Sequence, residues 1–281
     1  MILLLKIINN EQGEISMIPE DLFQFAYCRT KEMNFKDYIN ELSRKAIKED
    51  WGNENRILKN YLNFTFSKLA SDYNMNSIED KHKFVCFNSD KCCFNTGLFN
   101  EYYEPIFAYF KKNVYKKEGD DQSPWFLVGF KVPSDSELNV FEELPLRAQF
   151  FKEASDLVYD YRLEIRANVR HILGDKENIN RLPKSYSEME PLVLVQILEG
   201  AIKTAEKRVS ANYKLAVPQF YKNNLQLLIP LSLIKENQAD LALVLKKEGN
   251  IYTARTCLTL DMAYNNARLI VKPESEWLKA Q

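Results

Sequence analysis

The chain has 281 residues, of which 27% are charged, and its formal net charge is -1 at pH 7. This length fits either one large domain or two of ordinary size, and both allow a substantial hydrophobic core. The balanced charge excludes a general attraction to nucleic acid, to a membrane surface or to an acidic partner, so a polyanion would have to be held by a local patch.

Composition and short motifs narrow the function classes further. Glycine is scarce, at eight residues, and neither a GxGxxG nor a GxxxxGK[ST] cluster occurs, which excludes the usual dinucleotide and P-loop phosphate sites. The apolar run of residues 1–8 is far shorter than the roughly 20 residues that cross a bilayer, so we expect no membrane partner. Five cysteines and no usable signal peptide indicate a reducing, cytoplasmic setting. The sequence identifies neither a cofactor nor an oligomeric state.

Residues 1–80 are predicted to form an N-terminal helical segment. Residues 1–17 have the pattern of a short strand and a turn. Pro19 suits the first turn of a helix, and apolar residues then recur at helical spacing as far as residue 75. Trp51-Gly52-Asn53 interrupts this pattern. We therefore expect two or three helices within residues 19–75.

Residues 81–281 are predicted to form an α+β core. Apolar runs flank polar turns at residues 83–95, 215–233 and 240–260, which is typical of β-hairpins. Hairpins outnumber crossovers, so we expect a mainly antiparallel sheet, with the N-terminal helices packed on it in one continuous globular unit. The other expected elements are strands at residues 104–110 and 124–132, a polar connector at 116–122, and helices at 191–212 and 261–270.

The segment of residues 162–170 alternates between polar and apolar side chains without a fault. This period of two predicts a strand with one apolar face and one charged face. The guanidinium groups on the charged face match the oxygens of phosphate in bidentate geometry. Equally, opposite charges on such a face pair in solvent and contribute little. The charged face consists of Arg162, Glu164, Arg166, Asn168 and Arg170.

Five phrases of the sequence carry a resemblance to a known family. They are residues 94–98 (FNTGL), 103–107 (YEPIF), 163–166 (LEIR), 216–221 (AVPQFY) and 258–270 (LTLDMAYNNARLI). From about residue 20 onward the chain resembles a bacterial family known as a domain of unknown function. Its members sometimes carry a cold-shock or similar RNA-binding module, so the resemblance implies an association with RNA and assigns no catalytic residue.

The candidate site residues fall into three groups. Glu164 and His171 are the candidate catalytic residues, because a carboxylate or an imidazole can transfer a proton. Aromatic and basic side chains near residues 214–222 would stack bases and hold a nucleic-acid backbone. The candidate binding residues are Arg166, Asn168 and Arg181 near the alternating segment, Lys214, Gln219 and Tyr221 around a hairpin, and Asp261, Asn265 and Arg268 on one face of the last helix, where Asp261 would equally serve as the helix cap.

The cysteines near residue 90 raise the question of a metal site, but we do not predict one. Cys92 and Cys93 would point to opposite faces of a strand, and no C-x-x-C pair accompanies them or the nearby His82 and Cys86. Cysteine also behaves as a small buried hydrophobic residue. No nucleophile-elbow motif supports a cysteine or serine nucleophile.

Two hypotheses from different classes follow. In the first, the protein acts on RNA or a nucleotide as a hydrolase or nuclease, and an effector of bacterial defence would use the same chemistry. In the second, the same face binds RNA or a partner protein without chemistry. A catalytic site would hold Glu164 and His171 together in a concave pocket, whereas a binding module would spread basic and aromatic groups over an open surface.

Overall fold

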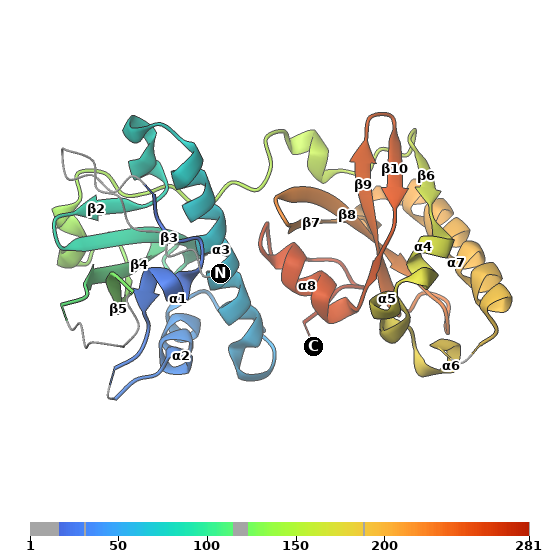
Figure 1. Cartoon of the computed structure of the whole chain (residues 1–281), viewed down its shortest axis with the longest axis horizontal. Coiled ribbons are helices and arrows are strands. Elements are labelled where there is room, and N and C mark those ends of the chain that lie inside the picture. The colour runs from blue at the N-terminus through green and yellow to red at the C-terminus, as the bar shows by residue number, and fades with distance from the viewer. Residues whose placement is uncertain (1–16, 31, 115–122, 188, 281) are drawn as a thin grey trace, which may run out of the picture. The chain divides into compact units, whose positions relative to one another are not determined.

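The computed structural model describes residues 17–30, 32–114, 123–187 and 189–280 (Figure 1). The strand expected within residues 1–17 and the connector expected at residues 116–122 lie outside these ranges. Contacts between Cα atoms group the chain into two compact units, Met1–Ala148 and Gln149–Gln281. This division differs from the predicted split near residue 80, because each unit contains its own sheet and its own helices.

A five-stranded sheet forms the centre of the first unit, in the order β1-β5-β4-β3-β2. Neighbouring strands are antiparallel except for β1 and β5, which are parallel. The hairpin predicted at residues 83–95 is confirmed, as are the strands predicted at 104–110 and 124–132. The strands are β1 (Ala26–Tyr27), β2 (Cys86–Asn88), β3 (Lys91–Phe99), β4 (Pro105–Lys112) and β5 (Trp125–Lys131).

The N-terminal helices of the first unit pack on this sheet. Three α-helices confirm the two or three that were predicted, and Gly52, with a φ of 68°, lies at the expected interruption in the left-handed region that favours glycine. Phe66 of α3 is buried, with its ring centroid 5.2 Å from that of Phe94 on β3. The helices are α1 (Leu22–Phe25), α2 (Phe35–Lys45) and α3 (Arg56–Met75), with short 3-10 turns at Asn53–Asn55, Ile78–Lys83 and Ser136–Val140.

The second unit contains a sheet in the order β6-β10-β9-β8-β7, with a short strand β11 paired to β9. β6 and β10 are parallel, and the other pairs are antiparallel. The hairpins predicted at residues 215–233 and 240–260 are confirmed. The strands are β6 (Glu164–Ala167), β7 (Val217–Tyr221), β8 (Asn224–Leu231), β9 (Leu241–Glu248), β10 (Ile251–Ala254) and β11 (Cys257–Leu258).

Two helices pack on opposite faces of this sheet. Leu198 of α7 belongs to one buried cluster with Leu227 of β8 and Tyr252 of β10, so α7 covers the face to which these residues point. Asn266 of α8 donates a hydrogen bond to Gln219 of β7 over 3.1 Å, on the other face. The helices are α4 (Val169–Gly174), α5 (Lys176–Arg181), α6 (Lys184–Ser187), α7 (Pro191–Ala211) and α8 (Leu260–Arg268), with 3-10 turns at Ala154–Leu157 and Tyr213–Leu215.

Both sheets are mixed, mostly antiparallel and built of hairpins, which confirms the predicted α+β class. Within the described residues, no helix combines the length and apolar character that spanning a membrane requires.

The strand predicted over residues 162–170 is shorter than expected. It ends at Ala167, and helix α4 begins at Val169. The physical reason is Asn168, whose side-chain oxygen accepts a hydrogen bond from the backbone N–H of His171 over 2.9 Å and so caps the helix. The alternation of exposed and buried side chains nevertheless continues as far as Arg170.

Asp261 is not the cap of helix α8, which was the alternative role considered for it. Thr259 is the capping residue, since its hydroxyl accepts a hydrogen bond from the backbone N–H of Met262 over 3.3 Å. Asp261 lies inside the first turn, where a negative charge complements the helix dipole.

Candidate functional site

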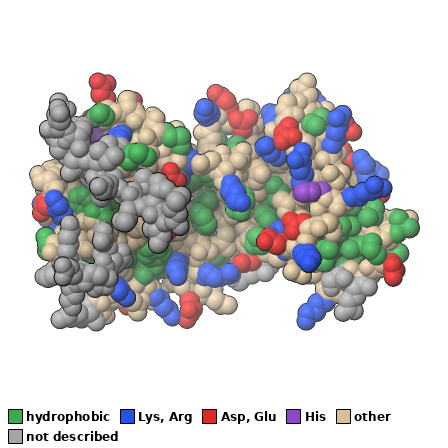
Figure 2. Space-filling model, in the orientation of Figure 1, with side chains coloured by type: hydrophobic (Ala, Val, Ile, Leu, Met, Phe, Trp, Pro, Cys, Tyr) green, Lys and Arg blue, Asp and Glu red, His purple; other side chains and the backbone are tan. Residues whose placement is uncertain are grey.

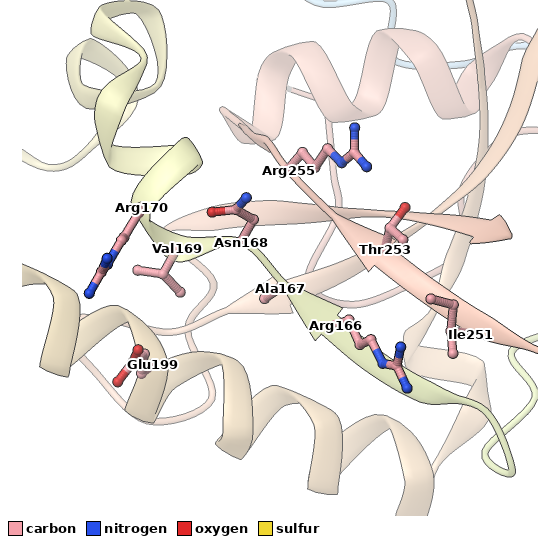
Figure 3. A pocket seen from close by; sticks show the side chains of 9 residues that line it. All are labelled: Arg166, Ala167, Asn168, Val169, Arg170, Glu199, Ile251, Thr253 and Arg255. Atoms are coloured by element: carbon pink, nitrogen blue, oxygen red, sulfur yellow. The ribbon is translucent and has the colours of Figure 1, made fainter.

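A groove of about 470 Å³ runs along the outer strand β6 of the second unit (Figure 3). Strands β6 and β10, the start of α4 and one turn of α7 all contribute to it. The side chains that line it are Arg166, Ala167, Asn168, Val169, Arg170, Glu199, Ile251, Thr253 and Arg255. Three arginines and one glutamate are the charged groups among them, so the groove carries an excess of positive charge.

The three arginines differ in how much of their hydrogen-bonding capacity the protein uses. Arg166 donates from Nε to Oε2 of Glu164 over 3.0 Å, and both side chains are 62% exposed. Such an exposed pair contributes little free energy, so its guanidinium can exchange partners. Arg170 and Arg255 make no hydrogen bond or ion pair within the described part of the chain. Their donors are therefore available to a ligand.

Two polar side chains lie between these arginines. Asn168 uses its side-chain oxygen for the cap of α4, which leaves the amide nitrogen as a donor facing the groove (Figure 3). Thr253 contacts the backbone oxygen of Lys246 over 3.4 Å. A hydrogen bond from Lys246 lowers the pKa of Glu248, and a hydrogen bond from Thr253 and the charge of Arg255 lower it further, so Arg255 lies near enough to act on this carboxylate.

The two candidate catalytic residues are not brought together in this groove. Glu164 and His171 are both exposed, and neither lines the groove. Figure 2 shows Lys and Arg side chains interspersed with Asp and Glu side chains on one face of the second unit. The two side chains therefore do not share a concave pocket among the described residues.

Arg181 is held by the protein itself. Its Nη1 donates to Oδ1 of Asn178 and to the backbone oxygen of Cys257, both over 2.9 Å, and to Oγ1 of Thr256 over 3.3 Å. Its Nη2 donates to Glu177 over 3.1 Å. The side chain is only 16% exposed and does not line the groove. Arg181 thus joins α5 to the segment that follows Arg255.

The candidates around the β7–β8 hairpin separate into different environments. Gln219 is fully buried, donates to Gln226 over 2.9 Å and accepts from Asn266. Tyr221 is 46% exposed at the end of β7, where the ammonium of Lys222 lies 5.3 Å from its ring centroid. Lys214 precedes β7 and so lies at the other end of that strand.

The candidates on α8 lie on the helix that covers part of the sheet. Asn265 donates from Nδ2 to the backbone oxygen of Asp261 over 2.9 Å. Arg268 is 9% exposed, and none of the three lines the groove along β6.

The five cysteines are buried and reduced. Burial raises the pKa of Cys86 and of Cys257 to about 12, and it raises the pKa of Cys92 and Cys93 as well. These thiols therefore stay protonated near neutral pH and are poor nucleophiles. Across the residues that the structure describes, no group of three or more His, Cys, Asp or Glu side chains could hold a metal ion.

Seven groove residues were absent from the candidates drawn from the sequence: Ala167, Val169, Arg170, Glu199, Ile251, Thr253 and Arg255. β10 lies beside β6 through a parallel pairing of segments far apart in the chain, and Ile251 pairs with Glu164. Sequence patterns carry no signal for such a pairing. The sequence did contain a signal for Arg170, because this residue continues the alternation of the charged face.

The second unit is therefore an α+β module whose outer strand and open sheet face present arginine and amide donors. The chain belongs to the family described as a domain of unknown function (DUF3825), whose family model matches residues 42–277. No curated protein and no solved structure matches the chain.

Proposed function

We propose that the second unit binds the phosphate groups of RNA or of a nucleotide in the groove along β6, without carrying out chemistry there. The observation that supports this proposal is that Arg170 and Arg255 both line one groove and make no hydrogen bond or ion pair within the described residues. Guanidinium groups match phosphate oxygens geometrically and carry their charge at every physiological pH. The RNA-binding modules that some members of the resembling family carry agree with a phosphate-rich partner, although no such module is visible in this sequence.

The exposed position of Glu164 supports binding over catalysis. A general base needs to approach the reacting proton within hydrogen-bonding distance, in a site that excludes water. Glu164 instead lies outside the groove lining and pairs with Arg166 in solvent. In a binding site, its carboxylate competes with phosphate for the guanidinium of Arg166.

The proposal predicts that replacing both Arg170 and Arg255 by Gln weakens binding of fluorescein-labelled decauridylate by roughly 100-fold, since each hydrogen bond from a charged group contributes about 1.5 kcal/mol or more. The slope of log affinity against log salt should fall by about 1.4, because two phosphate contacts on a single strand are lost. Fluorescence anisotropy at several salt concentrations measures both quantities. Lys272→Gln, an exposed cation of the same unit outside the groove, is the matched control and should change neither.

Glu164→Gln distinguishes binding from catalysis by the sign of its effect. As a competitor for Arg166, Glu164 weakens binding, so its neutral isostere should raise the affinity for decauridylate. As a proton-transfer group, it would be needed for turnover, and the same change would abolish cleavage of the RNA by the parent protein. Cleavage that disappears in this variant would overturn the non-catalytic proposal, and unaltered binding by the double arginine variant would overturn the phosphate site.

A further inference from the structure

Polar side chains form a row that crosses the sheet of the second unit at the level of Arg166. Arg166 on β6 pairs with Thr253 on β10, and Thr253 pairs with Lys246 on β9. The next position of the β9–β8 ladder, after the pair Leu245 and Leu227, places Gln226 opposite Lys246. Gln226 in turn pairs with Gln219 on β7. Every strand of the five-strand path thus contributes one polar residue to the row.

This row lies on the face of the sheet opposite α7. Side chains alternate between the faces, and the residues adjacent to the row, such as Ile165 and Tyr252, belong to the buried cluster under α7. On the row's own face, α8 covers only the far end, where Asn266 bonds Gln219. Arg166 and Lys246 are exposed, and Thr253 and Gln226 are half-buried. The row therefore continues the groove as an open track toward α8.

The track ends beside an exposed aromatic ring. Tyr221 lies two residues from Gln219 on the same face of β7, which makes it a diagonal neighbour of Gln226 at a distance of about 7–8 Å. The ammonium of Lys222 lies 5.3 Å from the centroid of this ring. An exposed contact of this kind is weaker than the stacking of a base on the ring, so a base can take its place.

The acidic residues beside the row do not exclude a phosphate chain from it. Glu164 and Glu248 flank the row, and each already pairs with a cation of the row, Arg166 or Lys246, over 3.0 Å. These exposed pairs neutralise the acids locally. The cations without such a pair, Arg170 and Arg255, lie at the groove end, so the phosphate contacts gather there and the base contacts gather near Tyr221.

We infer that the ligand is a single-stranded nucleic acid laid across the strands, with its backbone in the groove of β6 and a base stacked on Tyr221. This inference rests on the proposed function and adds the form of the ligand. Four inter-strand steps of about 4.8 Å span roughly 19 Å, which accommodates at most about six nucleotides at roughly 3.4 Å per nucleotide of a stacked strand. A duplex cannot follow this path, because its bases are paired and unavailable for stacking on a side chain.

Oligonucleotides of graded length test the inference. Fluorescein-labelled oligouridylates of two, four, six and ten nucleotides are titrated by anisotropy, with oligothymidylates and a ten-base-pair RNA duplex in parallel. The affinity should rise up to about six nucleotides and then level off, and the duplex should bind at least tenfold more weakly than the ten-nucleotide strand. Tyr221→Ala should weaken the hexamer by roughly tenfold, as expected for one lost base stack, and leave the dinucleotide unchanged.

Tyr213→Ala is the matched control, because Tyr213 is 51% exposed and lies outside the row. A hexamer that binds no better than the dinucleotide, or a Tyr221→Ala variant that behaves like Tyr213→Ala, would overturn the path across the sheet and leave the phosphate groove standing. Tighter binding of the duplex would do the same. If no oligonucleotide of either sugar binds the parent protein, the proposed function fails along with this inference.

Discussion

Arg181→Ala is expected to lower the free energy of unfolding by about 2–4 kcal/mol, because it leaves buried acceptors without their donor. The guanidinium spans Asn178 on α5 and the backbone oxygen of Cys257 on β11, and the surrounding protein leaves it only 16% exposed. When the guanidinium is removed, these acceptors lose their donor while the surrounding protein still shields them from water. Denaturant unfolding followed by circular dichroism measures the change.

Two further variants separate the parts of this network. Glu177→Gln removes only the partner that is 80% exposed, and we expect a loss below about 0.5 kcal/mol. Arg181→Lys keeps the charge but lacks the planar guanidinium. Its loss of stability should lie between the losses of Arg181→Ala and Glu177→Gln. An Arg181→Ala protein as stable as the parent would show that Arg181 is not a structural residue, and would return it to the candidates for ligand binding.

The network also explains why a sequence-based site can mix structural and binding residues. Arg166, Arg181 and Arg268 look alike in a sequence, since each is an arginine near polar neighbours. The structure leaves Arg166 exposed beside the groove, encloses Arg181 in hydrogen bonds and buries Arg268 on α8. Burial depends on what packs against each residue from elsewhere in the chain, and local patterns do not contain that information.

Local elements, in contrast, were largely predictable. The helix at residues 191–212 and the hairpins at 215–233 and 240–260 depend on hydrophobic periodicity and on turn residues, which act over a few positions. Lys222 and Asn223, for example, take the positive φ values of 47° and 58° that a two-residue hairpin turn requires. The pairing of β6 with β10 was not predictable, because it joins separated segments in parallel without a turn between them.

The end of the strand at Ala167 shows a competition within one segment. The alternation of polar and apolar residues favoured a strand as far as Arg170, and the exposure pattern does follow it. Asn168 nevertheless caps a helix with its own side chain, which offers the backbone a different set of hydrogen bonds. This cap turns the chain at the groove and brings Arg170 opposite Glu199 of α7 (Figure 3).

Gly97→Ala is expected to destabilise the first unit by about 2–4 kcal/mol, through a strained φ and a steric overlap that add. Gly97 has a φ of 75°, and a Cβ at this position would come within 2.6 Å of the hydroxyl oxygen of Tyr61. That hydroxyl cannot move freely, because it donates a hydrogen bond to the backbone oxygen of Thr96 over 2.9 Å. Thermal and denaturant unfolding of the full chain measure the loss.

Gly249→Ala isolates the backbone contribution to this loss. Gly249 has a φ of 60°, and a Cβ added there would meet no atom within 4 Å, so its replacement should cost only about 1 kcal/mol. Combining Gly97→Ala with Tyr61→Phe removes the overlapping oxygen, and the double variant should recover part of the stability that Gly97→Ala loses. Equal losses for Gly97→Ala and Gly249→Ala, with no recovery in the double variant, would contradict the steric explanation and attribute the requirement for glycine to φ alone.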